Sequence, residues 1–293
     1  MLSSGLQNMT GTTDDAAAWD SLFKYYNLSH GLGEVGYSSG ETFAIKTNNN
    51  AIWKGDEGIN TSPQITWAIL DQLVNQAGVK ERHIYIGDPN CGTVDYTYDY
   101  CSTDFPDVNY WGKNASVIPV DDVLVLSDGT LSDPLPYSYV DASYLINIPV
   151  LKKHHRAGIS IAAKNHFGSI APFTEGAWHL HYSLPCPEAS GVAENGDYGV
   201  YRCFVDLMGH KDLGGKTMLY LIDALYAAPH QSVLPEKWQS APFGDHWTAS
   251  VLASQDPVAI ESVAVDFSAA EKTARLMEGT VDNYLHEAAL ADR

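Results

Sequence analysis

The sequence predicts an α/β fold with a mainly parallel sheet flanked by helices. Three segments indicate this fold: a strand expected at 42–46, a helix at 61–77 and a short apolar strand at 83–86. Strand, helix and strand at this spacing form a βαβ unit, whose two strands pair in parallel. We expect long irregular loops at the carboxyl edge of the sheet, where α/β proteins bind their ligands.

The helix at 61–77 is the best-defined element. Ser62 and Pro63 provide its cap and first turn, and apolar residues such as Ile65, Ile69 and Leu73 recur at helical spacing. The pair Asp256-Pro257 predicts the start of another helix, because proline suits the first helical position.

Hydrophobic periodicity places the remaining elements. Helices are expected at 14–26, 201–208, 257–267 and 269–289, and strands at 116–126, 144–149, 218–222 and 246–252. The segment 156–164 is either helical or extended, whereas 88–114 and 169–199 lack periodicity and are expected to be long loops. No internal repeat or low-complexity linker divides the chain, so we expect residues 1–293 to form a single domain.

The charge of the chain limits its partners. It has 17 basic and 36 acidic side chains, with a formal net charge of −19. Such a field repels nucleic acid and anionic lipid. No run approaches the roughly 18 apolar residues that a membrane span requires. A small-molecule substrate is therefore the expected partner, and the oligomeric state stays open.

The two ends of the chain suggest a trimmed protein, and the cysteines leave open whether disulfides form. The chain begins Met1-Leu2-Ser3-Ser4-Gly5 without a signal peptide and stops directly after a helical pattern, so we expect a fragment of a longer protein. The four cysteines form no C-x-x-C pair. Disulfides between Cys91 and Cys101 and between Cys186 and Cys203 are conceivable, and four reduced thiols are the alternative.

Common catalytic signatures are mostly missing. The run Gly36-Tyr37-Ser38-Ser39-Gly40 fits G-x-S-x-G, but a nucleophilic serine of this type follows a strand and precedes a helix. Here a strand follows, so Ser38 is expected in a turn rather than as the nucleophile of a serine hydrolase. The sequence contains no P-loop, dinucleotide-binding or H-E-x-x-H motif.

The segment 144–168 carries the most chemical information. An apolar strand ends near Pro149, and five basic or imidazole side chains follow at 152–156. Cations directly beyond a parallel strand lie at the edge where ligands bind. Lys164 has small apolar neighbours, and partial burial would lower the pKa of its amine. On these residues alone, salt bridges to some of the many carboxylates explain the cations equally well.

This segment resembles the hallmark of the domain-of-unknown-function 362 family. The shared pattern begins with an apolar strand followed by L-x-K-x-H, which is Leu151 to His155 here. A short glycine-containing stretch and K-N-x-F-G at 164–168 complete it. Four further stretches resemble the family in order, at 43–48, 77–88, 219–225 and 251–264. The resemblance covers most of the chain. It implies a bacterial protein exported to the periplasm or cell exterior, because many relatives have a twin-arginine signal.

A more distant resemblance is to the nickel-pincer lactate racemase family. That family has a histidine, a glycine four residues later and a lysine ten residues after the histidine, and the lysine carries the cofactor. His154, Gly158 and Lys164 reproduce this spacing, and Asp256-Pro257 resembles a later turn. The two glycines before that lysine are Ala162 and Ala163 here, so the resemblance implies a shared scaffold rather than the same cofactor.

These observations define the expected site. The residues expected to be catalytic are His154 and His155 as acid/base or ligand, Lys164 as cation or covalent anchor, and Asp88 and Asp223 as carboxylate partners. Residues expected to bind the ligand or cofactor are Lys46, Asn48, Lys152, Gly158 and Asn165. The expected metal ligands are His166, His179 and His181, for a divalent Zn, Ni, Mn or Fe ion.

The expected function is that of an exported enzyme acting on a small acidic or carbonyl-containing substrate. Metal-assisted hydrolysis is favoured, and proton transfer next to a carbonyl uses the same residue types. The alternative from another class is a non-catalytic module that binds a metal or small anion.

Overall fold

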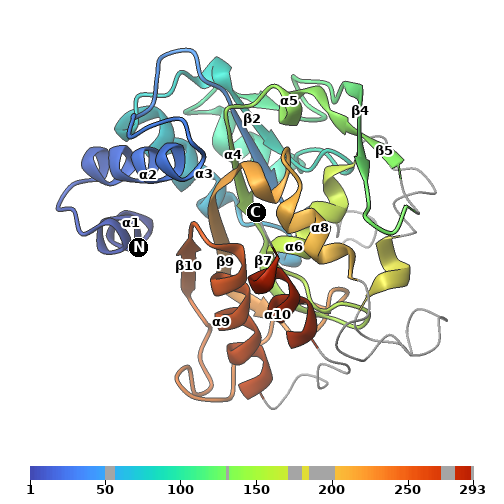
Figure 1. Cartoon of the computed structure of the whole chain (residues 1–293). Helices are drawn as coiled ribbons and strands as arrows, with labels where there is room; N and C mark the ends of the chain where they lie inside the picture. The colour runs from blue at the N-terminus through green and yellow to red at the C-terminus, as the bar shows by residue number, and fades with distance from the viewer. Residues whose placement is uncertain (50–56, 130–131, 171–179, 185–201, 272–280, 292–293) are drawn as a thin grey trace.

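The computed structural model describes residues 1–49, 57–129, 132–170, 180–184, 202–271 and 281–291. An eight-stranded, mostly parallel sheet lies at its centre (Figure 1). The strands are, in spatial order, β3 (Asn109–Tyr110), β2 (Ile84–Gly87), β1 (Phe43–Thr47), β6 (Tyr144–Ile148), β9 (Thr217–Ala228), β7 (Val150–His154) and β8 (Gly158–Ile159), with β10 (Ser250–Ser254) also paired to β9. The predicted fold class is confirmed.

The long strand β9 pairs with three other strands, β6, β7 and β10. Strands β6 and β7 are separated by Pro149 and pair in parallel with successive parts of β9. Strand β10 pairs with β9 in the antiparallel sense, and β8 does the same with β7. The carboxyl ends of β1, β2 and β6 lie beside one another, and β7 continues along β9 beyond the end of β6.

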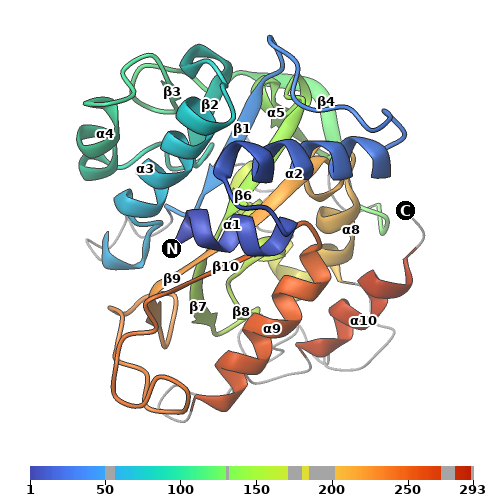
Figure 2. The same cartoon turned by 90° about the vertical axis from the view of Figure 1, so that its left-hand side faces the viewer.

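Helices cover both faces of the sheet (Figures 1 and 2). On one face lie α1 (Leu2–Thr10), α2 (Asp15–Ser29), α3 (Pro63–Asp71) and α4 (Asp95–Ser102). On the other lie α6 (Ala162–Asn165), α8 (Cys203–Gly209), α9 (Pro257–Ala270) and α10 (Asp282–Leu290). Successive side chains of a strand point to opposite faces of the sheet. In β1, Phe43 and Ile45 therefore pack against the first helix layer, and Ala44 packs against the second.

Local caps explain where the principal helices begin. The Ser62 side chain accepts a hydrogen bond from Ile65 N, and Pro63 occupies the first turn of α3. Asp256 likewise caps α9 by accepting from Val258 N and Ala259 N. Both starts were predicted from the sequence and are confirmed. Helix α3 ends earlier than predicted, because its last turn at Gln72–Gln76 is a π-helix.

Several elements differ from the prediction. Helix α1 was not expected, and the stretch 88–114, expected to be a loop, contains α4 and β3. Thr97 and Cys101 of α4 are buried one turn apart, a contact that its polar sequence conceals. The predicted helix at 269–289 is wrong as one element, since α9 ends at Ala270 and α10 begins at Asp282. Most of the second expected loop lies outside the described residues.

Smaller elements lie beside the main sheet. Strands β4 (Pro119–Val125) and β5 (Ser132–Pro136) form a separate antiparallel hairpin, followed by the short helix α5 (Tyr137–Val140). Ser38 lies in the loop before β1, where its N–H donates to the Glu41 carboxylate at 2.6 Å, so the strand–serine–helix arrangement is not formed. No helix in the described ranges is long and apolar enough to cross a membrane.

The cysteines do not pair as the sequence allowed. The Cys101 sulfur lies 3.8 Å from the Pro63 carbonyl and is a free thiol, so no bridge joins it to Cys91. Burial raises the pKa of the Cys101 and Cys203 thiols to about 12. Cys203 is likewise a free thiol, so the bridge from Cys203 to Cys186 is not formed; Cys186 itself lies outside the described residues.

Candidate functional site

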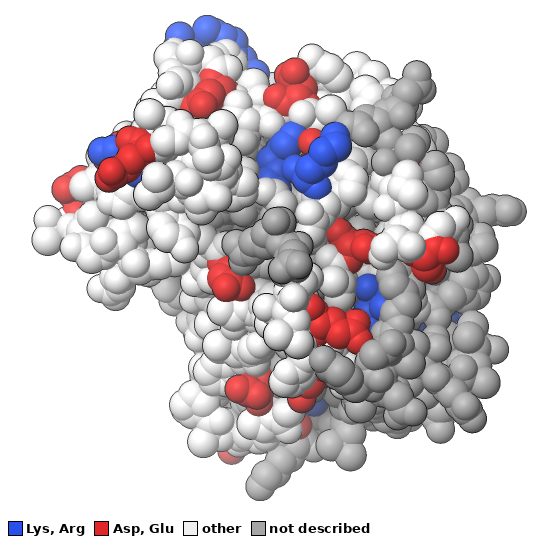
Figure 3. All heavy atoms as spheres, viewed as in Figure 1, with Lys and Arg blue, Asp and Glu red and all other residues white. Residues whose placement is uncertain are grey.

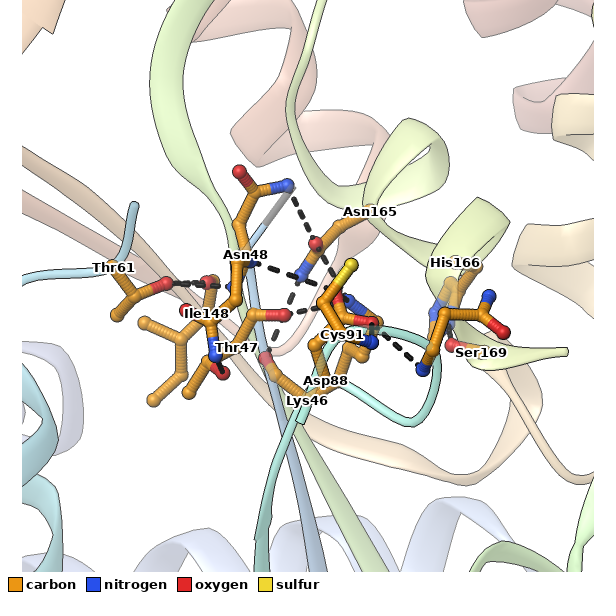
Figure 4. A network of polar contacts seen from close by, with 12 residues as sticks. Lys46, Thr47, Asn48, Thr61, Asp88, Cys91, Ile148, Asn165, His166 and Ser169 are labelled. Carbon is orange, nitrogen blue, oxygen red and sulfur yellow. Dashed lines mark hydrogen bonds and ion pairs between the residues drawn. The ribbon is translucent and has the colours of Figure 1, made fainter. Parts of the chain in front are cut away.

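Polar side chains gather where β1, β2 and β6 approach their carboxyl ends (Figure 4). Lys46 and Asn48 come from the end of β1, Asp88 directly follows β2, and Asn147 comes from β6. All four are buried. The clustering follows from the parallel topology, which brings these strand ends to one edge.

Lys46 is completely hydrogen-bonded. Its Nζ donates to the Thr47 carbonyl at 2.5 Å, to Asp88 Oδ2 at 2.7 Å and to Asn165 Oδ1 at 3.1 Å. An ammonium has three N–H groups, so no donor is left over for a ligand. In this structure Lys46 holds the site together.

Asp88 is also fully engaged. Its Oδ1 accepts from Asn90 N at 3.0 Å and Cys91 N at 3.2 Å, while Oδ2 accepts from Lys46. A Cβ at Gly168 would lie 2.8 Å from Asp88 Oδ2 and 3.0 Å from Lys46 Nζ, so only glycine fits beside this pair. The carboxylate stabilises the turn after β2, and its lone pairs are directed to these donors.

A chain of amides connects the pair to His166. Asn165 donates to Asn147 Oδ1 at 2.8 Å, and Asn147 in turn lies 3.0 Å from His166 Nε2. Because the Asn147 amide donates, His166 Nε2 is the acceptor and Nδ1 carries the proton toward Ser169 Oγ, 3.1 Å away. Burial lowers the pKa of His166 to about 3, so the ring is neutral. Both ring nitrogens are occupied, and a metal would have to displace one of these bonds.

Lys152 is the second buried lysine of the site. Its Nζ donates to Asn48 Oδ1 and to the Ile59 carbonyl, the latter at 2.7 Å. Burial lowers its pKa to about 7, with further lowering by Lys164 and Lys46. The predicted group Lys46, Asn48, Lys152 and Asn165 is therefore brought together, with Asn48 hydrogen-bonded to Asn165 at 3.0 Å.

Lys164 differs from both. It lies in α6 with Nζ 3.8 Å from the centre of the Phe167 ring, and it makes no hydrogen bond within the described part of the chain. Burial lowers its pKa to about 7; the nearby Cys203 opposes this shift and Lys46 adds to it. Its amine is thus neutral in a substantial fraction of molecules near neutral pH.

Glu261, which the sequence analysis did not single out, positions the helix of Lys164. Its Oε1 accepts from Ala163 N at 2.5 Å and its Oε2 from the Tyr284 hydroxyl at 2.6 Å. The carboxyl is fully buried, and burial raises its pKa to about 7. Its place after an Asp-Pro helix start gave no sign of this contact, which joins α9, α10 and α6.

The two predicted catalytic histidines have different surroundings. His154 is buried, and its Nδ1 accepts from Arg156 N and Ala157 N, both at 3.1 Å. The proton of its neutral ring is therefore on Nε2. Burial, followed by the charge of Lys164, lowers the pKa of His154 well below its usual value. His155 is exposed and stacks on His154 with ring centres 5.2 Å apart.

Asp223 and Gly158 have structural roles in this arrangement. Asp223 accepts from Ser62 N at 2.8 Å and Leu225 N at 3.1 Å, which fastens the start of α3 to β9. Gly158 has φ 76° and pairs with His154 in the β7–β8 hairpin. A Cβ there would lie 2.2 Å from Val281 Cγ2, so glycine is required for packing.

The expected metal ligands do not converge in the described ranges. His181 packs edge-on against Phe167 with ring centres 5.0 Å apart, and His179 lies outside the described residues. Within those ranges no three His, Cys, Asp or Glu side chains form a group that could hold a metal ion. The divalent metal stays a prediction, which elemental analysis of the purified protein checks.

Fold and site together define an α/β protein with a lysine- and asparagine-rich site at the carboxyl edge of its sheet. A family model described as domain of unknown function (DUF362) matches residues 44–266. The chain belongs to this family, which confirms the resemblance inferred from its motifs.

One solved structure with a similar fold is the lactate racemase apoprotein from Thermoanaerobacterium thermosaccharolyticum. It is 14% identical, with a TM-score of 0.46, and the match covers 78% of this chain and 49% of the racemase. The chain thus spans about half the length of that protein. No curated protein matches the chain.

Proposed function

We propose that this protein is an enzyme that acts next to the carbonyl group of a small substrate, with the Lys164 amine as nucleophile. One observation carries the proposal: Lys46 and Lys152 donate to protein acceptors, whereas Lys164 has none among the described residues. A lysine amine is a nucleophile only when it is unprotonated, and desolvation favours that form.

The chemistry follows from the position of this amine. The Lys164 nitrogen adds to the carbonyl carbon, the resulting carbinolamine takes up a proton from solvent and loses water, and a protonated imine remains. The imine withdraws electrons from the neighbouring carbon, so a proton on that carbon leaves more readily. The released proton passes to water. The Nε2–H of His154, whose Nδ1 already accepts two backbone N–H groups, orients the substrate by donating a hydrogen bond to it.

Reductive trapping tests the nucleophile. The protein is incubated with glycolaldehyde and cyanoborohydride, and the modified lysines are mapped by mass spectrometry. We expect Lys164 to be modified fastest, with a rate that is half-maximal near pH 7 because its pKa is about 7. Lys24, which is exposed and paired with Asp20, is the internal control. Equal modification of Lys24 and Lys164 at neutral pH would contradict the proposal.

Proton exchange separates an enzyme from a binding module. In deuterated water, NMR follows exchange of the methyl protons of pyruvate, a small carbonyl-containing acid. Exchange above the buffer rate is expected for the wild type, and loss of it for Lys164→Arg and His154→Ala. His155→Ala is the matched control, because this neighbouring histidine is exposed. Exchange that persists in Lys164→Arg would refute the assignment, and a protein that binds pyruvate without exchange would be a binding module.

A further inference from the structure

The turn between β7 and β8 carries polar groups that the proposed nucleophile does not use. His154 and Gly158 pair across this hairpin, which places Arg156 in the turn. Ser160 N donates to the Lys152 carbonyl at 2.8 Å, and α6 with Lys164 follows at once. The hairpin and the helix of Lys164 are therefore directly connected.

The Arg156 guanidinium has no hydrogen-bond acceptor among the described residues. Its Nε is buried without a hydrogen-bond partner, and no ion pair joins its guanidinium to a carboxylate of the described residues. This is unexpected in a chain with 36 acidic and 17 basic side chains, whose acidic groups are scattered over the surface seen in Figure 3. A buried N–H without a partner costs free energy, and that cost is recovered when an external acceptor binds.

His154 adds a second N–H donor. The side chain is 8% exposed, and its Nδ1 is occupied by two backbone N–H groups, so Nε2–H is the free end of the ring. Nε2 has no partner in the described part of the chain. Lys164 is the charge that acts most strongly on His154, and Arg156 in turn lowers the pKa of Lys164. The three groups thus share one electrostatic environment and all present N–H donors.

We propose that Arg156 and His154 form a subsite for the carboxylate of the substrate, beside the Lys164 amine. A guanidinium offers paired N–H groups that match the two oxygens of a carboxylate, and charge-assisted bonds of this kind are among the strongest. This inference rests on the proposed function only for the part played by Lys164. It narrows the substrate class to small acids that carry a carbonyl group near the carboxylate.

Calorimetric titration with oxalate tests the subsite directly. We expect oxalate to bind the wild type, to bind Arg156→Gln at least about tenfold more weakly, and to bind Arg156→Lys with intermediate affinity. Arg82→Gln is the control, because Arg82 is exposed and precedes β2 far from the turn. Absence of oxalate binding to the wild type, or an equal loss in Arg82→Gln, would overturn the subsite. Tighter binding of inorganic phosphate would overturn the carboxylate assignment.

A second measurement does not depend on the variants folding. In protein labelled with 15N, the Nε–H resonance of Arg156 is followed by NMR during the oxalate titration of the wild type. A saturable shift of this resonance is expected, and a resonance that stays in place while oxalate binds would place the anion elsewhere.

Competing aldehydes distinguish failure of the subsite from failure of the proposed function. Glyoxylate carries a carboxylate and glycolaldehyde does not, and both modify lysine under cyanoborohydride. Faster modification of Lys164 by glyoxylate, lost in Arg156→Gln while glycolaldehyde modification persists, supports both proposals. Equal rates in the wild type would refute the subsite and leave the nucleophile standing. Oxalate binding without modification of Lys164 by either aldehyde would refute the nucleophile and leave the subsite standing.

Discussion

Lys46 and Lys164 lie at the same edge of the sheet and close enough for the charge of one to act on the other, but their surroundings are opposite. Lys46 is fully buried and bonds to a carboxylate, a carbonyl and an amide. Lys164 is partly exposed and contacts an aromatic ring. Hydrogen bonds to three acceptors hold the Lys46 amine in place and make it structural. The Lys164 amine has a lowered pKa and no acceptor among the described residues, so it is available for chemistry.

The largest expected effect is on stability, at Lys46. Lys46→Met leaves the Asp88 carboxylate buried without its counterion, and removal of one partner of a buried pair costs about 3–5 kcal/mol. Urea unfolding measures this loss. Lys24→Met is the control, since its pair with Asp20 is solvent-exposed and is expected to contribute little to stability. Similar losses in the two variants would refute the structural role of Lys46.

At Lys164 the expected effect is on activity and not on stability. Lys164→Met removes the nucleophile, and the pyruvate exchange rate is expected to fall by about 10²-fold or more. Its unfolding free energy is expected to stay the same or rise, because no hydrogen bond within the described residues is lost. The exchange rate and the free energy of unfolding are measured on one preparation, so that the loss of activity here can be compared with the loss of stability in Lys46→Met. A variant that unfolds more easily and retains exchange would reverse the roles of the two lysines.

Gly168 tests how tightly the Lys46–Asp88 pair is enclosed. The added methyl of Gly168→Ala meets both charged groups at 3.0 Å or less, so we expect a loss of about 1–3 kcal/mol in thermal or urea unfolding. Gly209→Ala provides the matched control, because a Cβ there has no neighbour within 4 Å. An unchanged stability of Gly168→Ala would show that the pair is loosely packed.

The pH dependence of stability compares the acid Glu261 with the bases Lys152 and Lys164, which contribute with opposite sign. The pKa of Glu261 is raised from 4.5 to about 7, so its contribution to stability is greatest below pH 4.5 and is lost as pH rises to about 7. The pKa values of Lys152 and Lys164 are lowered from 10.5 to about 7, so the unfolded chain binds more protons between these values. Stability due to the lysines therefore increases from about pH 7 to 10.5.

Two variants separate the fall in stability between about pH 4.5 and 7 (the acidic limb) from the rise between about pH 7 and 10.5 (the alkaline limb). Both are measured by urea unfolding as a function of pH. Glu261→Gln is expected to flatten the acidic limb and to leave the alkaline limb unchanged. Lys164→Met is expected to reduce the alkaline limb alone. An acidic limb that persists in Glu261→Gln would assign it to another carboxyl.

The sequence was sufficient for features that depend on near neighbours in the chain. The starts of α3 and α9 follow from Ser62 and Asp256, whose side chains bond to N–H groups two or three residues ahead. Apolar periodicity indicated β1, α3 and β2, and the cations after β6 indicated the edge at which the site lies. Helix α4 was missed because its two buried positions face α3 and leave no periodic pattern in a polar segment.

Only the tertiary structure decided which polar side chains have their donors and acceptors hydrogen-bonded within the protein. Lys46 bonds to Asn165, 119 residues away, and Glu261 reaches Ala163 across 98 residues. The order of strands that brings these groups together depends on the packing of whole layers, and no local pattern encodes it. From the sequence alone Lys46, Lys152 and Lys164 look alike. The physical reason they differ is the number of acceptors that the folded chain places around each amine.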